Sequence, residues 1–250
     1  MNKILSKYYF TIFFILNFVI FNSLSTDTQK VKILESEDAL MLYQTMKDVH
    51  EILGKYNIEY YADFGTLLGA IRHKGIIPWD DDLDISIKKE FEKKLELIKD
   101  DLDKLGYKII TQFFGYRIYN QKGKEIPNCK THKFPFLDIF IVEQKNGKVY
   151  YQLSNIYSWG KRDGEEIFIK EEELYPLKLY NFGEIKIWGP NNPIPFLNAL
   201  YPNWQNTAQR WYDHSQEKPI VLQTFDLKEE KKNPLNQQDH YKTELTSFFK

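Results

Sequence analysis

Four aspartates within five residues, Asp80, Asp81, Asp82 and Asp84, form the feature of this sequence best suited to chemistry. From Asp82 onward polar and apolar residues alternate, which predicts a strand with Asp82 and Asp84 on one face and Asp81 facing outward. Two carboxylates side by side repel each other unless a cation lies between them. A hard divalent ion, Mg²⁺ or Mn²⁺, is the usual occupant of such a site. The alternative interpretation is an acidic, solvated turn.

A glycine-threonine turn upstream of the aspartates has the composition of an anion site. Gly65 and Thr66 come directly before an apolar run that suits the first turns of a short helix. A strand, a turn of this kind and a helix together aim free backbone N–H groups and a hydroxyl at a bound anion. Arg72, His73 and Lys74 follow, and their side chains could pair with phosphate oxygens. We therefore predict that all five residues bind phosphate, with a structural histidine as the alternative for His73.

Asp138 is the only charged residue in the apolar run FPFLDIFIV, residues 134–142, which is expected to be a buried strand. Burying a lone carboxylate is costly unless it meets a partner or a metal ion. A buried acid of this kind is a candidate functional residue. The structural alternative is an aspartate held in a salt bridge.

The run GTLLGAIRHKGIIPWDDDLDI, residues 65–85, resembles the signature of the LicD/fukutin family, which belongs to the nucleotidyltransferase superfamily that includes DNA polymerase β. The resemblance implies that the glycine-threonine turn holds nucleotide phosphates. It also implies that Asp82 and Asp84 bind metal and that a third carboxylate on a later strand, assigned to Asp138, completes the catalytic set. Relatives keep an acidic residue at the position of Asp80, which therefore joins these three as a metal ligand, directly or through water.

The resemblance further implies a reaction. Members of the family transfer a substituted phosphate, such as phosphocholine from CDP-choline or ribitol phosphate from CDP-ribitol, onto a glycan. The expected partners are therefore a CDP-activated donor and a glycan or glycoconjugate acceptor, with Mg²⁺ or Mn²⁺ as cofactor. Two alternatives stay open: a glycosyltransferase that uses a nucleotide sugar, and a catalytically inactive relative that binds glycans.

The resemblance implies an α+β fold with a nucleotidyltransferase (DNA polymerase β-like) core, in which helices flank a mixed sheet. Hydrophobic periodicity agrees with such an order of elements. The expected elements are a helix over 36–53, a strand over 57–62, a short helix from 65, a strand over 82–87, a helix over 91–105, strands over 107–111, 115–119 and 134–142, a polar hairpin over 144–151, and a closing strand, turn and helix between 178 and 204.

Composition sets limits on partners and covalent links. The formal net charge of −1 over 250 residues gives no electrostatic case for binding nucleic acid. The single cysteine, Cys129, excludes an intrachain disulfide and a zinc site made of several cysteines. The 18 Phe, 17 Tyr and 5 Trp suit an ordinary core as well as stacking against a sugar, choline or a nucleobase.

The N-terminus has the pattern of a targeting segment. Lys3 and Lys7 precede an apolar run over residues 8–21, which is shorter than a spanning helix, so a cleaved signal peptide is favoured over a signal-anchor that attaches the chain to a membrane. Either form predicts the lumen of the secretory pathway, Golgi or ER, or secretion. The expected segments are a signal peptide or anchor (1–25), a linker (26–36), a LicD-like nucleotidyltransferase-fold domain (37–213) and a polar, poorly ordered C-terminal tail (214–250).

Overall fold

A computed structural model describes residues 32–151, 161–162 and 165–227. The predicted signal segment over 1–25 lies outside these residues, as do most of the predicted linker and residues 228–250. None of the helices in the described ranges is long and apolar enough to cross a membrane.

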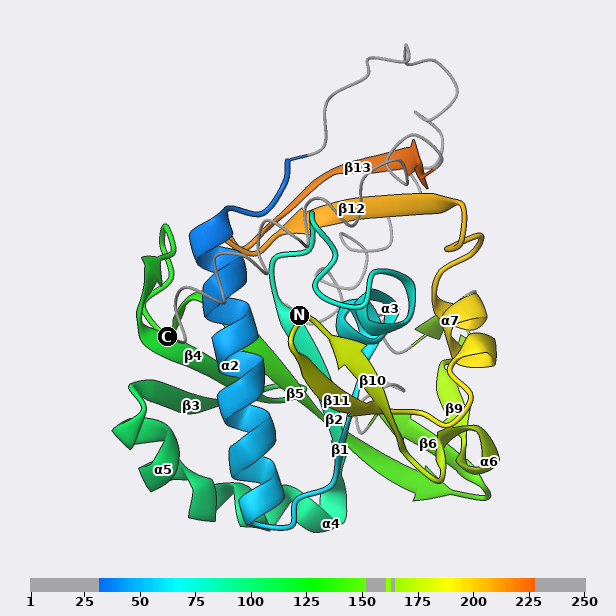
Figure 1. The fold of residues 1–250 in the computed structure, drawn as a ribbon, viewed down its shortest axis with the longest axis horizontal. Coiled ribbons are helices and arrows are strands. Elements are labelled where there is room, and N and C mark those ends of the chain that lie inside the picture. Colours follow the sequence, from blue (N-terminus) through cyan, green and yellow to red (C-terminus); the bar gives the residue numbers. More distant parts are fainter. Residues whose placement is uncertain (1–31, 152–160, 163–164, 228–250) are drawn as a thin grey trace, which may run out of the picture. The chain divides into compact units, whose positions relative to one another are not determined.

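The centre of the fold is a seven-stranded mixed sheet (Figure 1). Its main path runs β1 (Tyr60–Ala62), β2 (Leu83–Lys88), β5 (Lys133–Lys145), β4 (Gly115–Glu125) and β3 (Tyr107–Gln112), while β6 (Lys148–Tyr151) pairs with β5 and with β9 (Phe168–Lys170). The β2–β5 pair is parallel and the other pairs of this sheet are antiparallel. Together with the helices, this sheet confirms the predicted α+β class.

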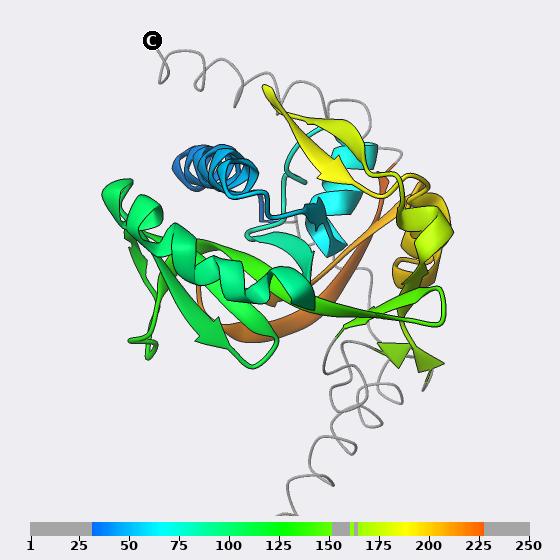
Figure 2. The same ribbon diagram turned by 90° about the horizontal axis from the view of Figure 1, so that it is seen from below.

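Helix α2 (Ser36–Lys55) lies across one face of the sheet and contacts β4 and β5 (Figures 1 and 2). Its apolar positions recur at intervals of three and four residues, which places them on one face of a helix. All five members of this stripe are buried without exposed surface: Ala39, Leu42, Met46, Val49 and Leu53. The helix predicted over 36–53 is therefore present, because its apolar stripe is buried against the sheet.

The helix predicted over 91–105 is divided into three short pieces. These are α4 (Lys89–Glu92), a 3₁₀ helix (Lys93–Ile98) and α5 (Lys99–Lys104). Leu95 and Ile98, three residues apart, are both buried. A spacing of three places both side chains on one face of a 3₁₀ helix, which has three residues per turn, so the tighter winding still buries them in the core.

The remaining elements pack around the sheet, several of them on the same side as α2 (Figure 2). They are α3 (Phe64–Arg72), the strand pair β7 (Lys161–Arg162) and β8 (Glu165–Glu166), α6 (Glu171–Leu174), the hairpin β10 (Lys178–Phe182) and β11 (Ile185–Gly189), and α7 (Ile194–Leu200). The strand, turn and helix expected between 178 and 204 are thus found as a hairpin followed by α7.

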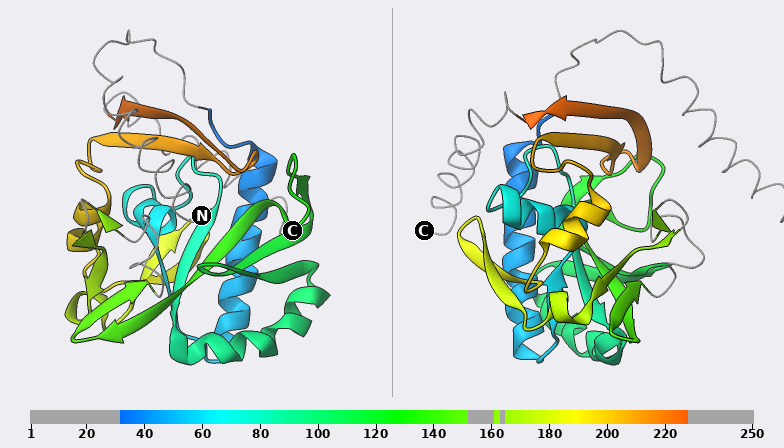
Figure 3. Two further views of the ribbon diagram at one scale, coloured as in Figure 1. Left: turned by 180° about the vertical axis from the view of Figure 1, so that it is seen from behind. Right: turned by 90° about the vertical axis from the view of Figure 1, so that its right-hand side faces the viewer.

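A second hairpin corrects the prediction for the C-terminal tail. Strand β12 (Thr207–Asp213) pairs with β13 (Lys218–Asp226), so the folded part of the chain continues beyond residue 213 (Figure 3). Most side chains of β13 are exposed or half-buried. Residues 207–226 therefore form a two-stranded surface hairpin.

Candidate active site

Three carboxylates meet where β2 and β5 run side by side. Asp84 and Asp138 are direct neighbours in the parallel register of these strands. Asp82 lies two residues before Asp84, directly before the strand begins at Leu83. One carboxylate oxygen from each of Asp82, Asp84 and Asp138 lies within 4.8 Å of those of the other two. The structure thus brings together the three residues assigned to the catalytic set.

Burial and mutual repulsion shift the acidities of these groups. Burial raises the pKa of the Asp82 carboxyl to about 6, against an opposing effect from His214. Burial also raises the pKa of Asp84 well above its usual range, and the charges of Asp82 and Asp138 add to that effect. Three buried oxygen donors that resist ionisation in one another's presence are a suitable set for a hard divalent cation. The residues therefore fit Mg²⁺ or Mn²⁺.

Asp80 lies against the first turn of α3. A Cβ atom added to Gly65 would lie 2.2 Å from Asp80 Oδ2, so only glycine admits this carboxylate at the helix N-terminus. Burial raises the pKa of Asp80 well above its usual range, and the charges of Asp82 and Asp81 add to this effect. The N-terminus of α3, which was predicted to hold phosphate, is thus next to the Asp80 carboxylate. The helix dipole favours a negative charge at this position.

The glycine-threonine turn is fixed by hydrogen bonds to β2. Thr66 Oγ1 accepts a 2.8 Å hydrogen bond from the backbone N–H of Asp84, and its own hydroxyl proton remains a donor. Asp63, which precedes α3, is fully buried, and its carboxylate accepts hydrogen bonds from Ser86 Oγ (2.5 Å) and from Tyr151 (2.9 Å). Asp63 was not predicted as a site residue, although an aspartate before an apolar helical run is a usual N-cap.

Arg72 faces the site from the far end of α3. Its Nη1 atom donates hydrogen bonds to the backbone oxygens of Trp204 (2.7 Å) and Thr207 (3.3 Å). Burial lowers the pKa of the Arg72 guanidinium to about 10, and the nearby Asp80 carboxylate acts in the opposite direction. Among the three predicted cations of this segment, Arg72 is therefore the one in electrostatic contact with an acidic residue of the site.

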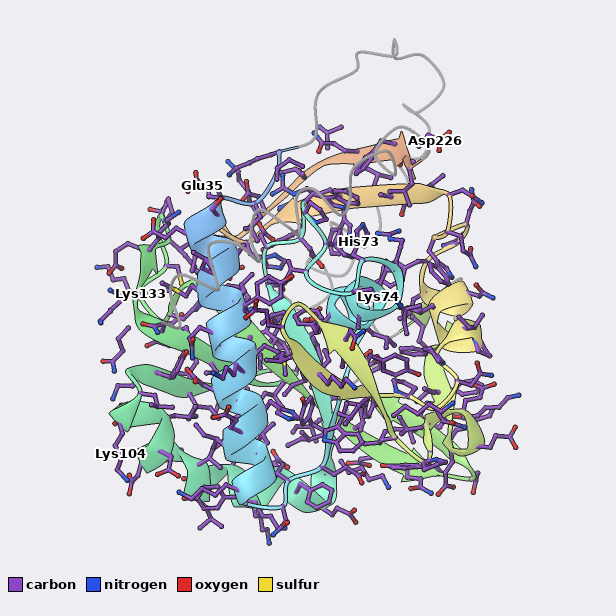
Figure 4. The ribbon with its side chains drawn as sticks, viewed as in Figure 1. Glu35, His73, Lys74, Lys104, Lys133 and Asp226 are labelled. Atoms are coloured by element: carbon purple, nitrogen blue, oxygen red, sulfur yellow. The ribbon has the colours of Figure 1, made fainter. Side chains whose placement is uncertain are left out.

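The other two predicted phosphate contacts have structural surroundings. His73 is buried and packs edge-on against Trp79, and burial, with the charge of Arg72, lowers the pKa of its imidazole to about 3. Lys74 donates a 2.9 Å hydrogen bond from Nζ to the backbone oxygen of Ile71. Figure 4 labels both residues at the C-terminal end of α3, the end opposite the Gly65 turn. This geometry matches the structural alternative for His73.

Asp138 has a partner that the sequence analysis did not assign. Arg117 on β4 forms a bidentate ion pair with it, with Nε 2.7 Å from Oδ1 and Nη2 2.8 Å from Oδ2. The guanidinium also lies 3.5 Å from the centre of the Phe136 ring. Burial raises the pKa of Asp138, and Arg117 opposes that shift. Asp138 is therefore both salt-bridged and adjacent to Asp84.

Glu217, in the turn between β12 and β13, extends this ion pair. Its Oε1 atom accepts a 2.7 Å hydrogen bond from Arg117 Nη1 and lies 2.9 Å from His132 Nε2. Burial raises the pKa of Glu217, but the hydrogen bond from His132 and the charge of Arg117 outweigh it and lower the pKa to about 2. A residue of the predicted tail thus contacts the acidic site through Arg117.

His214, in the same turn, connects two of the consecutive aspartates. Its Nδ1 atom lies 2.7 Å from Asp81 Oδ1, and its Nε2 atom lies 3.3 Å from Asp82 Oδ2. Burial lowers the pKa of His214, but the charges of Asp82 and Asp81 outweigh it and raise the pKa to about 10. Oxygen or nitrogen atoms of Asp81, Asp82 and His214 also lie within 4.8 Å of one another.

Asp81 therefore does not face outward as predicted. Its side chain is buried and also accepts a 3.4 Å contact from Arg210 Nη2. The prediction failed because strand β2 begins at Leu83, so strand alternation does not extend back to Asp81. The partners that bury it, His214 and Arg210, lie far away in the sequence.

The comparison with protein families identifies the chain. Residues 57–192 match the family described as the LicD/FKTN/FKRP nucleotidyltransferase domain, which covers more than half of the 250 residues. The chain belongs to this family, which confirms the resemblance found in residues 65–85.

Three relatives show how far the similarity extends. An uncharacterized protein of Rickettsia prowazekii is 43% identical over 199 residues, which make up 80% of this chain and 68% of that protein. The lipopolysaccharide cholinephosphotransferase LicD of Haemophilus influenzae is 31% identical over 133 residues, which make up 49% of this chain and 50% of that protein. The human ribitol 5-phosphate transferase FKRP is 43% identical over 49 residues, 20% of this chain and 10% of that protein. This chain therefore matches half or less of the two relatives with named activities.

Among solved structures, the lincomycin-bound lincosamide adenylyltransferase LnuA is similar over 64% of this chain and 82% of that chain, with a TM-score of 0.36 and 14% identity. ANT(2")-Ia in complex with adenylyl-2"-tobramycin is similar over 51% of this chain and 67% of that chain, with a TM-score of 0.32 and 15% identity. Similarity at this level supports no conclusion about substrate.

Proposed function

We propose that this chain is a metal-dependent phosphotransferase that moves a substituted phosphate, phosphocholine or a polyol phosphate, from a CDP-activated donor to a hydroxyl of a glycan or glycoconjugate. The observation that supports this proposal most directly is the meeting of Asp82, Asp84 and Asp138 at the parallel β2–β5 junction, beside the N-terminus of α3. Family membership supports the transfer of a substituted phosphate.

The carboxylates of Asp82, Asp84 and Asp138 would hold the divalent cation, with Asp80 close enough to Asp82 to interact with it electrostatically. When bound, Mg²⁺ or Mn²⁺ neutralises charge on the phosphate oxygens and lowers the pKa of the acceptor hydroxyl. The acceptor oxygen would form the new bond to phosphorus, its proton would pass to a carboxylate oxygen of the same cluster, and CMP would leave as its bond to that phosphorus breaks.

Neighbouring residues hold these carboxylates in position. Arg117 binds both carboxylate oxygens of Asp138. His214, which is also bonded to Asp81, contacts one carboxylate oxygen of Asp82. The backbone N–H groups at the start of α3, with the hydroxyl of Thr66, would bind the donor phosphates beside the Asp80 carboxylate. Arg72 adds a positive charge near Asp80. This division of roles makes catalysis a matter of positioning and electrostatics.

A donor screen on the full chain tests the proposal. CDP-choline, CDP-ribitol, CDP-glycerol and a panel of UDP- and GDP-sugars are incubated with the chain and Mg²⁺ or Mn²⁺, and nucleotide release is measured. Metal-dependent CMP release from a CDP donor, lost in Asp84→Asn, is the expected result and names the transferred group. Release of UDP or GDP alone would instead identify a glycosyltransferase. Absence of turnover and of donor binding would favour the glycan-binding alternative.

We also propose that residues 1–25 direct the chain to or across a membrane, as the apolar run over 8–21 predicts. Relatives with named activities come from bacteria and mammals, so the pattern supports no particular compartment. Cell fractionation of the full chain and of a variant lacking residues 8–21 tests this part. The deletion variant should move from the membrane or exported fraction to the cytosol.

A further inference from the structure

The β12–β13 hairpin carries a group of exposed apolar side chains. Trp211 is 62% exposed, Val221 is 86% exposed and Leu222 is 41% exposed. These three residues are called the hairpin patch below. Figures 1 and 3 show the hairpin at the end of the fold where α2 begins. Exposed apolar residues scattered singly are ordinary, whereas several at one place mark a candidate interaction surface.

The pairing of the two strands explains why the patch faces away from the fold. Arg210 and Gln223 are direct partners across the hairpin, and Arg210 is buried. Because side chains alternate along a strand, the next residue on each strand, Trp211 and Leu222, lies on the opposite, outer face. Val221 comes directly before Leu222, in the part of β13 where the strand register shifts. The three side chains are therefore neighbours at the outer surface.

The size of the patch favours a lipid surface over a protein partner. A stable protein interface buries about 800 Å² on each partner and involves about 20–30 residues. The outer face beside the patch is polar, because Gln209 and Thr224, which are direct partners, are both exposed there. A few aliphatic side chains with a tryptophan suit shallow insertion into a membrane, where tryptophan rings lie at the level of the headgroups.

Exposed lysines lie at the turn end of the hairpin, next to the patch. Lys218 is exposed at the start of β13. Lys32 is also exposed, and it lines one cavity together with the turn residue Gln216. Asp213 and Glu217, two acids of this end, are half-buried and form ion pairs with arginines. The lysine side chains are therefore well placed to meet lipid phosphates.

The chain upstream of Lys32 brings this end of the fold to a membrane. The apolar run over 8–21 is the segment proposed above to direct the chain to or across a membrane, and residues 22–31 connect it to Lys32. An extended chain spans at most about 3.3–3.6 Å per residue, so these ten residues reach about 36 Å at most. A membrane that holds the apolar run would therefore keep the turn end of the hairpin close to its surface.

We propose that the hairpin patch inserts shallowly into a lipid membrane and holds the acidic site near the membrane surface. The assignment rests on the proposed role of residues 1–25, with the apolar run retained in the working chain. His214 and Glu217 of the same hairpin contact Asp82 and Arg117. One element therefore contacts both the membrane and the acidic site.

Fluorescence quenching on the full chain in lipid vesicles tests this surface. Cys129→Ser removes the native cysteine, and a polarity-sensitive dye is attached to Val221→Cys or, as a control, to Lys104→Cys. Lys104 is exposed, and Figure 4 labels it at the opposite end of the fold from Asp226 of β13. The vesicles contain phosphatidylcholine and phosphatidylglycerol, with or without a lipid that carries a nitroxide just below its headgroup.

We expect the nitroxide lipid to reduce the fluorescence of the dye at position 221 by at least about half, because interfacial apolar groups lie about 5–10 Å deep. The dye at position 104 should be unaffected. Trp211→Ser combined with Leu222→Ser should remove the quenching at position 221 without changing the fraction of the chain that floats with the vesicles. Gln209→Ala combined with Thr224→Ala is the matched control on the same face and should keep the quenching. Thermal unfolding checks the folding of each variant.

Several results would overturn the assignment. These are a dye at position 221 that is not quenched in chain that floats with the vesicles, equal quenching at positions 221 and 104, and quenching that survives loss of Trp211 and Leu222. A dye at position 221 that is already shielded from water without vesicles would show that protein covers the patch. A full chain that does not float would overturn the role of residues 1–25 as well. CMP release is measured separately, so an absence of quenching with intact donor turnover would leave the proposed phosphotransferase function standing.

Discussion

Arg117 and Asp138 face each other across β4 and β5 as register partners and form a two-point ion pair, with N–O distances of 2.7 and 2.8 Å. Both side chains are less than a tenth exposed. The same guanidinium binds Glu217 of the β12–β13 turn at 2.7 Å. A single arginine therefore connects the acidic site to the hairpin that covers it.

Replacing Arg117 with Leu should destabilise the fold by about 3–5 kcal/mol, because the buried carboxylate of Asp138 is left without a counter-charge. Chemical denaturation of the metal-free chain measures this loss. In an Asp138→Asn background the same replacement should cost clearly less, since the amide needs no counter-charge. Equal losses in both backgrounds would mean that Arg117 stabilises the fold through packing on Phe136 or its ion pair with Glu217, and not through the ion pair with Asp138.

The contact between Gly65 and Asp80 can be tested by a double-mutant cycle. Gly65→Ala places a methyl group closer to Asp80 Oδ2 than van der Waals contact allows, and displacing the carboxylate should cost about 1–3 kcal/mol of stability. In an Asp80→Ala background the space is free, and alanine should stabilise helix α3 relative to glycine by about 0.5–1 kcal/mol. Denaturant midpoints of the four proteins provide the measurement. A Gly65→Ala effect that is the same in both backgrounds would contradict this contact.

Local patterns in the sequence were sufficient to predict the part of the site that lies on neighbouring residues. Strand alternation placed Asp82 and Asp84 on one face, and the apolar run around Asp138 predicted a second strand, whose parallel register with β2 brings the three together. The predicted α+β class followed from the same periodicities and from the family resemblance. Arg117 is a charged residue at the centre of a short predicted strand, and this position marks it as unusual in the sequence. The sequence does not indicate that its partner is Asp138.

The rest of the site depends on contacts between distant segments. His214 and Glu217 lie in a polar stretch without strong periodicity, and their importance arises only when the hairpin packs over the acidic site. Strand alternation predicts an outward Asp81 only if the strand extends back past Leu83, where it in fact begins. His73 and Lys74 were grouped with Arg72 by adjacency, although the end of a helix sends consecutive side chains in different directions.

Glu217 should make stability depend on pH in the acid range. Its pKa in the folded chain is about 2, below the ordinary value of 4.5, so its ion pair stabilises the fold above pH 4.5 and is lost as the pH falls toward 2. Glu217→Gln should therefore lower the unfolding midpoint at pH 7, and the difference from wild type should shrink between pH 4.5 and 3. Glu51→Gln, an exposed glutamate on α2, is the control. A difference that does not change with pH would exclude the charge of Glu217 as its cause.

Asp84→Asn should separate metal binding from folding. The amide removes one of three buried, mutually repelling charges, so the metal-free variant should be at least as stable as wild type. Its affinity for Mn²⁺ should fall by more than about 100-fold, since even residues that only support metal ligands contribute about 10–100-fold.

Electron paramagnetic resonance titration with Mn²⁺ measures the affinity. Thermal unfolding with and without Mn²⁺ measures how much the bound cation stabilises the fold. A cation that binds only the folded wild-type chain at about 100 times its Kd adds about 2.7 kcal/mol of stability. Asp84→Asn should lose this metal-dependent rise, whereas Asp100→Asn, an exposed aspartate of α5, should keep it. An undiminished rise in Asp84→Asn would place the cation at Asp81, Asp82 and His214 instead, because that cluster retains all of its ligand atoms in the variant.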